Sequence, residues 1–301
     1  MEAFYVCGET ATGKSALAVE IAREFGGEII NADVYQSYRE LPILSAAPDP
    51  ADLRRVPHHL YLCHDARLAM DAVTYAREAS RVIAEVKGRG RLPIVVGGSS
   101  LYLKFLTHGP SPAPPGDDKL RAELDQRDLS ELVAELSALD PEEAARQNPL
   151  NRRHITRALE ICLLSGRKAS ELRQNWENPE LPHPLRGVLV RSEIEKLDER
   201  IQERIERMFA QGVVAEVAAL PDDAATAAKA IGVREIRDLL AGEIDEASCR
   251  ELIFRATRQY AKRQRNWFRK ESWLSPVPMS ALGEGTWRES VDALLHGCSS
   301  E

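Results

Sequence analysis

The sequence predicts an α/β protein whose parallel sheet is interrupted by an all-helical insertion domain. Three observations carry this prediction: a glycine-rich loop between a strand and a helix, further apolar strands that alternate with helices, and a central stretch with helical spacing alone. We expect residues 1–110 and 187–275 to form the α/β core, residues 111–186 the insertion, and residues 276–301 a C-terminal tail.

The glycine-rich loop, residues 8–15, fits the template G-x-x-x-x-G-K-[ST] at every fixed position. An apolar strand at 3–7 precedes it, and helical spacing begins at Ala16. This arrangement turns backbone N–H groups and a helix N-terminus toward an anion. The loop therefore predicts a P-loop NTPase-like core with Mg²⁺ as cofactor, held by Ser15. Its diphosphate- or nucleotide-binding residues are Gly8, Glu9, Thr10, Ala11, Thr12, Gly13, Lys14 and Ser15.

Three further strands are predicted, at residues 28–33, 92–96 and 186–190. The first ends on Asp33, at the strand end where open α/β sheets place their ligands, and we expect it beside the strand that precedes the loop. The second is a continuous apolar run, which is typical of a strand buried on both faces. It leads into a turn of small residues around Ser99, which repeats the strand–turn–helix arrangement of the first loop.

The Pro-rich stretch 110–116 predicts a change of domain, because prolines interrupt both helices and strands. From Asp117 to about Trp176 the spacing is helical throughout, and Pro182 and Pro184 mark the return to the core. The tail after Pro276 shows no clear pattern. Further helices are expected at residues 72–89, 195–211, 214–220, 231–241 and 246–270.

The chain of 301 residues carries 40 Lys and Arg against 47 Asp and Glu, a formal net charge of −7. This balance argues against a general polyanion-binding protein. Residues 255–270, however, carry seven Lys or Arg and no acidic residue, interleaved with Tyr260, Trp267 and Phe268. Such a local basic surface on an acidic protein indicates one defined anionic partner.

The composition also indicates where the protein works. No apolar run approaches the ~18 residues that a membrane span needs, and a strand begins too early to leave room for a signal peptide. Five scattered cysteines show neither a C-x-x-C pair nor metal-ligand spacing. We therefore expect a cytoplasmic, monomeric protein with reduced thiols and no membrane partner.

Several blocks of the sequence point to a family. They are the glycine-rich loop, residues 30–38, Val56-Pro57-His58-His59-Leu60, residues 93–102, 157–160 and 230–235, and residues 256–269. In this order they resemble the tRNA dimethylallyltransferases (tRNA isopentenyltransferase family), over nearly the whole of residues 4–270. The glycine-rich loop is shared with many NTPases, whereas the P-H-H-L block and the last block are far more specific.

The resemblance implies transfer of a dimethylallyl group from dimethylallyl diphosphate to N6 of adenosine 37 in tRNA, giving N6-isopentenyladenosine beside the anticodon. A diphosphate leaving group needs N–H donors, Lys14, and Mg²⁺ on Ser15. The exocyclic amine needs a carboxylate to take its proton, and the family assigns this base to Asp33. Ser99 is expected to hydrogen-bond near the diphosphate or Asp33, and Arg204 to contact the diphosphate.

The resemblance also implies a surface for the anticodon stem-loop, where cations bind phosphates and aromatic rings meet unstacked bases. The reacting adenosine must leave its stack, and the polar stretch at Gln36 can read its edge. Charge segregation favours phosphate contacts by the cations of residues 262–269, with Trp267 mostly packing. The implied tRNA-binding residues are Asp33, Val34, Tyr35, Gln36, Ser99, Arg121, Arg153, Arg157, Lys229, Arg234, Lys262, Arg263, Arg265, Trp267 and Arg269.

Four positions depart from the family's usual pattern. Ala47 stands in place of a lysine, Val34 in place of a serine, and Ser100 in place of a glycine. Glu9 replaces a proline inside the glycine-rich loop and adds a negative charge beside the phosphate site. Ser99 keeps the hydroxyl of the usual threonine.

Other interpretations remain open from the residues alone. An ATP-binding kinase or NTPase acting on a small metabolite would use the same loop and Asp33. A prenyltransferase acting on a free adenine nucleotide, or a catalytically weak RNA-binding relative, would also fit. The helical insertion and residues 255–270 favour tRNA. Asp33 can also cap a helix or hold Mg²⁺ through a water, and Ser99 can cap the helix that follows it.

Overall fold

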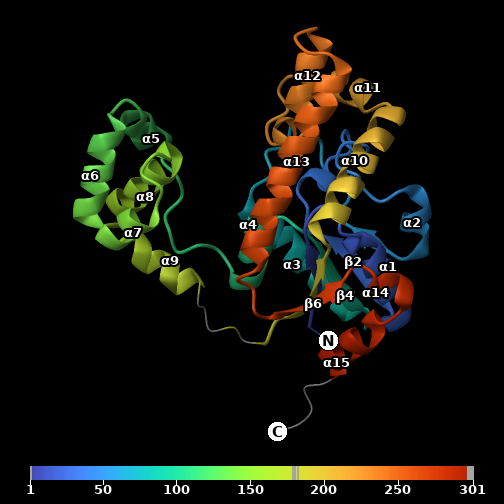
Figure 1. The fold of residues 1–301 in the computed structure, drawn as a ribbon. Coiled ribbons are helices and arrows are strands. Elements are labelled where there is room, and N and C mark those ends of the chain that lie inside the picture. The colour runs from blue at the N-terminus through green and yellow to red at the C-terminus, as the bar shows by residue number, and fades with distance from the viewer. Residues whose placement is uncertain (1, 178–180, 182, 297–301) are drawn as a thin grey trace. The chain divides into compact units, whose positions relative to one another are not determined.

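A computed structural model describes residues 2–177, 181 and 183–296 (Figure 1). The chain divides into two compact units. The first, called here the core unit, comprises residues 1–107 and 183–301, and the second, the helical unit, comprises residues 108–182. These limits lie within a few residues of those expected from the Pro-rich stretches.

The core unit contains a six-stranded parallel sheet, so the predicted α/β class is confirmed. The strand order is β3-β2-β4-β1-β5-β6. In the centre of the sheet, Val6 of β1 is in register with Val96 on one side and Val188 on the other. The strands are β1 (Phe4–Gly8), β2 (Gly27–Asn31), β3 (His58–His59), β4 (Leu92–Gly97), β5 (Arg186–Arg191) and β6 (Leu274–Pro278).

The strand that leads to Asp33 does not lie beside the phosphate-loop strand, so that expectation is wrong. Strand β4 separates them and pairs with both β1 and β2. Strands β1, β2 and β4 are all buried along their whole length and each has a neighbour on both sides, so burial alone does not fix their order. Strands β2, β4 and β1 are parallel, so the segments that follow them meet at the carboxyl ends of the strands. There the turn at Ser99 lies between the loop at 8–15 and Asp33.

Alternate residues of the strands pack into two apolar clusters, one on each face of the sheet. Tyr5 and Cys7 face the cluster formed with α3 (Ala72–Gly88), α10 (Ile194–Ala210) and α13 (Glu246–Phe268). Phe4 and Val6 face the cluster formed with α1 (Lys14–Phe25) and α15 (Trp287–His296). The period-two pattern of the strands thus produces three layers, helix–sheet–helix, within the core unit.

The C-terminal tail expected from residue 276, where the sequence shows no clear pattern, has regular structure as far as His296. The expected limit falls inside β6, and α14 (Ala281–Glu284) and α15 follow it. Trp287 is only 2% exposed and belongs to the core beneath β1 and β5. Pro276 and Pro278 concealed the strand, because two prolines within five residues are unusual in a strand, although an edge strand such as β6 tolerates them.

The remaining elements of the core unit surround the carboxyl edge of the sheet or cover its faces. No helix in the described part of the chain is long and apolar enough to cross a membrane. These elements are the short helices η1 (Tyr35–Ser37) and η2 (Ala227–Lys229), and α2 (Pro50–Arg55), α4 (Ser100–His108), α11 (Val213–Ala218) and α12 (Val233–Leu240).

The helical unit has no strand among its described residues. Leu132 and Leu136 of α6 pack against Ile155 and Leu159 of α8 to form its own apolar core. Asn151 caps α8, where its side chain accepts a hydrogen bond from His154 N. Its helices are α5 (Asp118–Asp125), α6 (Leu129–Leu139), α7 (Pro141–Arg146), α8 (Arg152–Ser165) and α9 (Ala169–Glu177).

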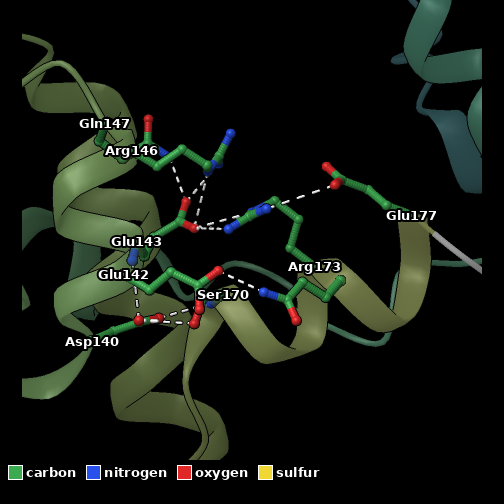
Figure 2. Close-up of polar contacts among 9 residues, drawn as sticks. Asp140, Glu142, Glu143, Arg146, Gln147, Ser170, Arg173 and Glu177 are labelled. Atoms are coloured by element: carbon green, nitrogen blue, oxygen red, sulfur yellow. Dashed lines mark hydrogen bonds and ion pairs between the residues drawn. The ribbon is translucent and has the colours of Figure 1, made fainter. Parts of the chain in front are cut away.

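Two buried carboxylates join α7 to α9, as Figure 2 shows. Asp140 is fully buried and accepts hydrogen bonds from Ser170 N at 2.7 Å and Ser170 Oγ at 2.8 Å. Glu143 binds Arg146 and Arg173, with ion-pair distances of 2.7 and 2.6 Å, and also Gln147. Burial acts to raise the pKa of Glu143, but these three donors outweigh it and lower the pKa to about 2.

We expect this network to make the helical unit sensitive to acid. The ordinary pKa of Glu143, 4.5, lies above its value in the folded protein, so its contribution is fully present above pH 4.5 and is lost as pH falls toward 2. Between pH 5 and 3 the unfolding free energy should fall by about 2 kcal/mol more in the natural chain than in Glu143→Gln.

Urea unfolding followed by circular dichroism would measure this difference. Glu142→Gln is the matched control, because Glu142 is the exposed neighbour of Glu143 on α7. Its acid dependence should remain that of the natural chain. Equal acid dependence of Glu143→Gln and the natural chain would show that Glu143 does not carry the effect.

Candidate active site

Two side chains of the phosphate loop donate hydrogen bonds to the same backbone carbonyl, that of Glu9. Thr12 Oγ1 donates to Glu9 O at 2.9 Å, and Lys14 Nζ donates to the same oxygen at 3.3 Å. Gly13 takes a left-handed conformation (φ 81°) just before α1, which a side chain would strain. The first turn of α1 contains no acidic residue, so the N–H groups at its start are open to an anion.

A cavity of about 80 Å³ lies in the core unit at the carboxyl edge of the sheet. Its polar lining includes Lys14 and Thr10 of the phosphate loop, Asp33, Gln36 and Arg204. With Tyr35, which also lines the cavity, the structure thus brings together six of the residues predicted from the sequence. The rest of the lining is largely apolar, and is drawn from α10, α13 and the loops: Leu44, Ile201, Ile205, Met208, Ala230, Ile231 and Ile253.

Asp33 is half-buried and is held by its own turn. Asn31, almost fully buried, donates from Nδ2 to Asp33 O at 2.8 Å and accepts from Asp33 N at 2.8 Å. Asp33 Oδ1 accepts from Tyr35 N at 3.1 Å, just before the short helix η1, and Asp33 also lines the cavity. The N-cap of η1 is Val34, so Asp33 is not the cap residue of that helix.

Arg204 is the arginine of α10 that reaches the site. It donates to Thr10 Oγ1 at 3.0 Å and to Leu44 O at 3.1 Å. Arg200 lies beside Gly13 and contacts Met279, whereas Arg207 is exposed and bonds to its own helix. Among the three arginines considered, Arg204 alone lines the cavity.

Burial lowers the pKa of both Lys14 and Arg204, and nearby Asp33 acts in the opposite direction. Arg204 also lowers the pKa of Lys14, and Arg207 lowers the pKa of Arg204, because like charges repel one another. Lys14 and Arg204 carry two positive charges against the one carboxylate of Asp33, so the buried side of the cavity has a net positive charge. An anionic ligand would relieve that cost, as expected for a phosphate site.

Tyr260 and Thr257 also line the cavity, and sequence reasoning did not assign either to the site. Burial raises the pKa of Tyr260, with a further contribution from Asp33, while a hydrogen bond with Ser99 acts to lower it. Ser99 is buried at the start of α4, where its carbonyl accepts Leu103 N at 3.0 Å. The helical spacing of residues 253, 257, 260 and 264 was the signal that could have found this face of α13.

Helix α13 holds the phosphate loop through two adjacent residues. Gln264, only 3% exposed, accepts from Thr10 N at 2.9 Å and donates to Gly98 O at 2.9 Å. Arg265 Nε donates to Glu9 Oε1 at 2.8 Å. Arg265, predicted to bind a tRNA phosphate, is therefore occupied by the loop's own carboxylate.

The loop at residues 43–46 is tied down over the cavity. Gln36 Nε2 donates to Ser45 O at 3.1 Å and Ala46 O at 2.9 Å, and Glu216 accepts from Leu44 N at 2.8 Å. Gln36 thus positions this loop, in addition to lining the cavity. The side chain of Val34 is buried in the core, so it does not present the polar surface expected for tRNA contact.

The predicted tRNA-binding cations fall into two groups. Arg121 and Arg157 both bind the buried carboxylate of Glu160, with Arg121 Nη2 at 3.0 Å from Oε1, so their charge is paired although their side chains remain 43% and 38% exposed. Trp267 is half-buried and packs edge-to-face on Phe268. The cations of this set that are exposed are Arg153, Lys229, Arg234, Lys262, Arg263 and Arg269.

The described residues contain no cluster of three or more His, Cys, Asp or Glu side chains that could hold a metal ion. Ser15 is exposed in the first turn of α1, and Asp33 lines the adjoining cavity. Magnesium usually takes only one or two protein oxygens and completes its shell with phosphate and water. The donors present fit a phosphate-bound Mg²⁺ rather than a metal held by protein alone.

Known proteins share this chain's sequence over most of its length. The IPP transferase family model matches residues 36–271. A tRNA dimethylallyltransferase of Akkermansia muciniphila is 45% identical over 276 residues, which cover 92% of this chain and 93% of the relative. A tRNA dimethylallyltransferase of Geobacter sulfurreducens is 44% identical over 284 residues, which cover 91% of each chain.

Solved structures are similar to this chain in fold. The full-length tRNA isopentenylpyrophosphate transferase of Bacillus halodurans superposes with a TM-score of 0.68 at 29% identity, covering 98% of this chain and 99% of its own. A eukaryotic dimethylallyltransferase acting on tRNA gives a TM-score of 0.78 at 24% identity, covering 97% and 77%, and shows likeness of fold alone. By the span of the family match and the identity to its relatives, this chain belongs to the IPP transferase family, the tRNA dimethylallyltransferases.

Proposed function

We propose that this enzyme transfers a dimethylallyl group from dimethylallyl diphosphate to N6 of adenosine 37 in tRNA, beside the anticodon. The observation that carries the proposal is the composition of the cavity. A cationic phosphate loop, a carboxylate and an apolar wall line one space of about 80 Å³. The form that we propose is a monomer in the cytoplasm.

The diphosphate would bind at the phosphate loop. The open N–H groups at the start of α1, with Lys14, Thr10 and Arg204, offer donors and positive charge to its oxygens. Ser15 would hold Mg²⁺ against the diphosphate, and the bound ion would help neutralise the charge of the leaving group.

The apolar wall separates this proposal from a small-metabolite kinase. Ile201, Ile205 and Met208 of α10 and Ile253 of α13 suit a five-carbon hydrocarbon, whereas a kinase would need polar groups there for its acceptor. A free adenine nucleotide as acceptor would leave the exposed cations of α13 without a partner.

Asp33 would act as the general base. In the reaction, the adenosine N6 attacks C1 of the dimethylallyl group, the C–O bond to the diphosphate breaks, and Asp33 takes the proton that N6 loses. Its backbone is fixed by the bonds to Asn31, its carboxylate accepts from Tyr35 N, and it lines the cavity together with Lys14. Tyr260, which contacts Ser99, would confine the flipped base on the α13 side.

Nucleoside mass spectrometry would test the proposed reaction directly. Unmodified tRNA incubated with the protein, Mg²⁺ and dimethylallyl diphosphate should yield N6-isopentenyladenosine, and AMP, ADP or ATP should not be prenylated. Replacement of dimethylallyl diphosphate by ATP should give no product on tRNA or on small metabolites. Phosphoryl transfer in the ATP arm, without prenylation in the other, would favour the kinase instead.

Asp33→Asn should lower the single-turnover rate by about 10²–10⁴-fold with little change in tRNA affinity, because a general base acts in the transition state. Asp245→Asn is the matched control. Asp245 also accepts a backbone N–H bond at a helix start, but lies outside the cavity. Near-full activity of Asp33→Asn in rapid-quench measurements would remove Asp33 from the role of base.

Lys262→Ala combined with Arg269→Ala should weaken tRNA binding and reduce the slope of log affinity against log salt by about one to two units. Both residues are exposed, and neither forms an ion pair within the part of the chain that the structure describes. Filter binding between low and moderate salt measures the slope.

Arg23→Ala with Arg288→Ala removes two exposed cations from α1 and α15, which pack together on the other face of the sheet. This control should leave tRNA affinity unchanged. If the first pair also left the affinity and its slope unchanged, α13 would present only a solvated surface.

A further inference from the structure

The phosphate loop contains a buried acidic residue where an anionic substrate is proposed to bind. Glu9 is 4% exposed, and its backbone oxygen receives the bonds of Thr12 and Lys14 described above. A carboxylate in this place repels a diphosphate, and a buried charge without a partner is costly. The loop can therefore bind an anion only if something compensates Glu9.

Arg265 of α13 makes both contacts that compensate it. Its Nε donates to Glu9 Oε1 at 2.8 Å, and its Nη2 lies 2.8 Å from Glu9 Oε2. The same Nη2 donates to Ser192 O at 3.4 Å, after β5. The guanidinium thus reaches both carboxylate oxygens, Oε1 by a hydrogen bond and Oε2 by an ion-pair contact that is not a hydrogen bond, and it is anchored to the sheet. A lysine cannot reproduce this two-atom fork.

Other cations lie near this pair. Arg258 borders the same cavity of about 600 Å³ as Glu9, and it pairs with Asp198 at 3.1 Å. Lys262 and Arg269 also border that cavity, and Arg191 borders a second cavity beside Glu9, but none of the three forms an ion pair with Glu9 within the described part of the chain. Among the described residues, Arg265 is therefore the side chain that pairs with Glu9.

We propose that Arg265 is a positioning residue of the diphosphate site, which neutralises Glu9 and fixes the phosphate loop, and that it does not bind tRNA. The proposal rests on the proposed function, since it takes a diphosphate as the ligand of the loop. Gln264, next to it, supports the same loop through Thr10 N and Gly98 O. Consecutive residues of α13 thereby fix the shape of the loop and remove its unfavourable charge.

A double-mutant cycle between Glu9 and Arg265 tests this assignment. Arg265→Met leaves Glu9 charged and unpaired, so the KM for dimethylallyl diphosphate and the Kd for inorganic pyrophosphate should rise by about tenfold or more. The tRNA affinity and its salt slope should not change. Glu9→Gln combined with Arg265→Met should return both constants to within about threefold of the natural values.

Two further variants keep the test decisive. Arg258→Met removes an arginine of the same helix that borders the same cavity but pairs with Asp198, and it should leave pyrophosphate binding unchanged. Arg265→Lys keeps the charge and loses the fork, so it should fall between the natural chain and Arg265→Met. Because it keeps a cation beside Glu9, it also serves if Arg265→Met does not fold.

Three outcomes would overturn the proposal. The first is a loss of tRNA affinity and salt slope in Arg265→Met with an unchanged pyrophosphate Kd, which would make Arg265 an RNA ligand. The second is an equal loss of pyrophosphate binding in the single and double variants, and the third is a loss as large in Arg258→Met.

Pyrophosphate binding is measured by calorimetry without tRNA or turnover. It therefore reports on the Glu9–Arg265 pair even if the prenyl acceptor proves to be something other than tRNA. Failure of the proposed function would appear only in the product analysis, so the two failures are distinguishable.

Discussion

The phosphate loop can serve an anion only if its N–H groups stay unpaired while its backbone stays fixed, and this constraint governs the core unit. Ordinary loops gain rigidity by pairing their own N–H groups, which would consume the donors the site needs. Here much of the rigidity comes from outside. Strands β4 and β5 flank the strand that leads into the loop, and Gln264 pairs with Thr10 N across 254 residues of sequence. That bond occupies one N–H of the loop, whereas no side chain caps the N–H groups at the start of α1. The active site is therefore completed only when the C-terminal half of the chain has folded against the N-terminal half.

Helix α13 serves several purposes because successive residues point in different directions. One face, with Ile253, Thr257 and Tyr260, lines the cavity, and Gln264 continues that face to the phosphate loop. Arg265 points to Glu9, on the side that borders α10. The exposed cations occupy the remaining surface. A single helix can thus contact the diphosphate site and offer charge to RNA, because a period of 3.6 residues separates these tasks in space.

The sequence predicted what depends on local chemistry and missed what depends on distant partners. The phosphate loop, Asp33 and the helical unit follow from short motifs and spacing, and the structure places Lys14, Asp33 and Arg204 around one cavity. The position of β4 between β1 and β2 could not be read, because strand order depends on how distant segments pack. Strand β6 was hidden by its prolines. Tyr260 lay in a block recognised for its charge, so its role in lining the cavity was overlooked.

The difference between local patterns and distant partners also explains why some predicted RNA-binding arginines are paired with acids of the protein itself. A buried carboxylate must be paired, and arginine is the side chain best suited to pair it. Glu9 takes Arg265, and Glu160 takes Arg121 and Arg157, over separations of 256, 39 and 3 residues. These arginines look like surface cations in the sequence, but their charge is balanced by the interior. In an acidic chain, the charge available to a nucleic acid is therefore set by which cations face no buried acid. By that criterion the candidates are the exposed cations, and three of them, Lys262, Arg263 and Arg269, lie on α13. We propose that this face of α13 contributes to the electrostatic attraction of tRNA.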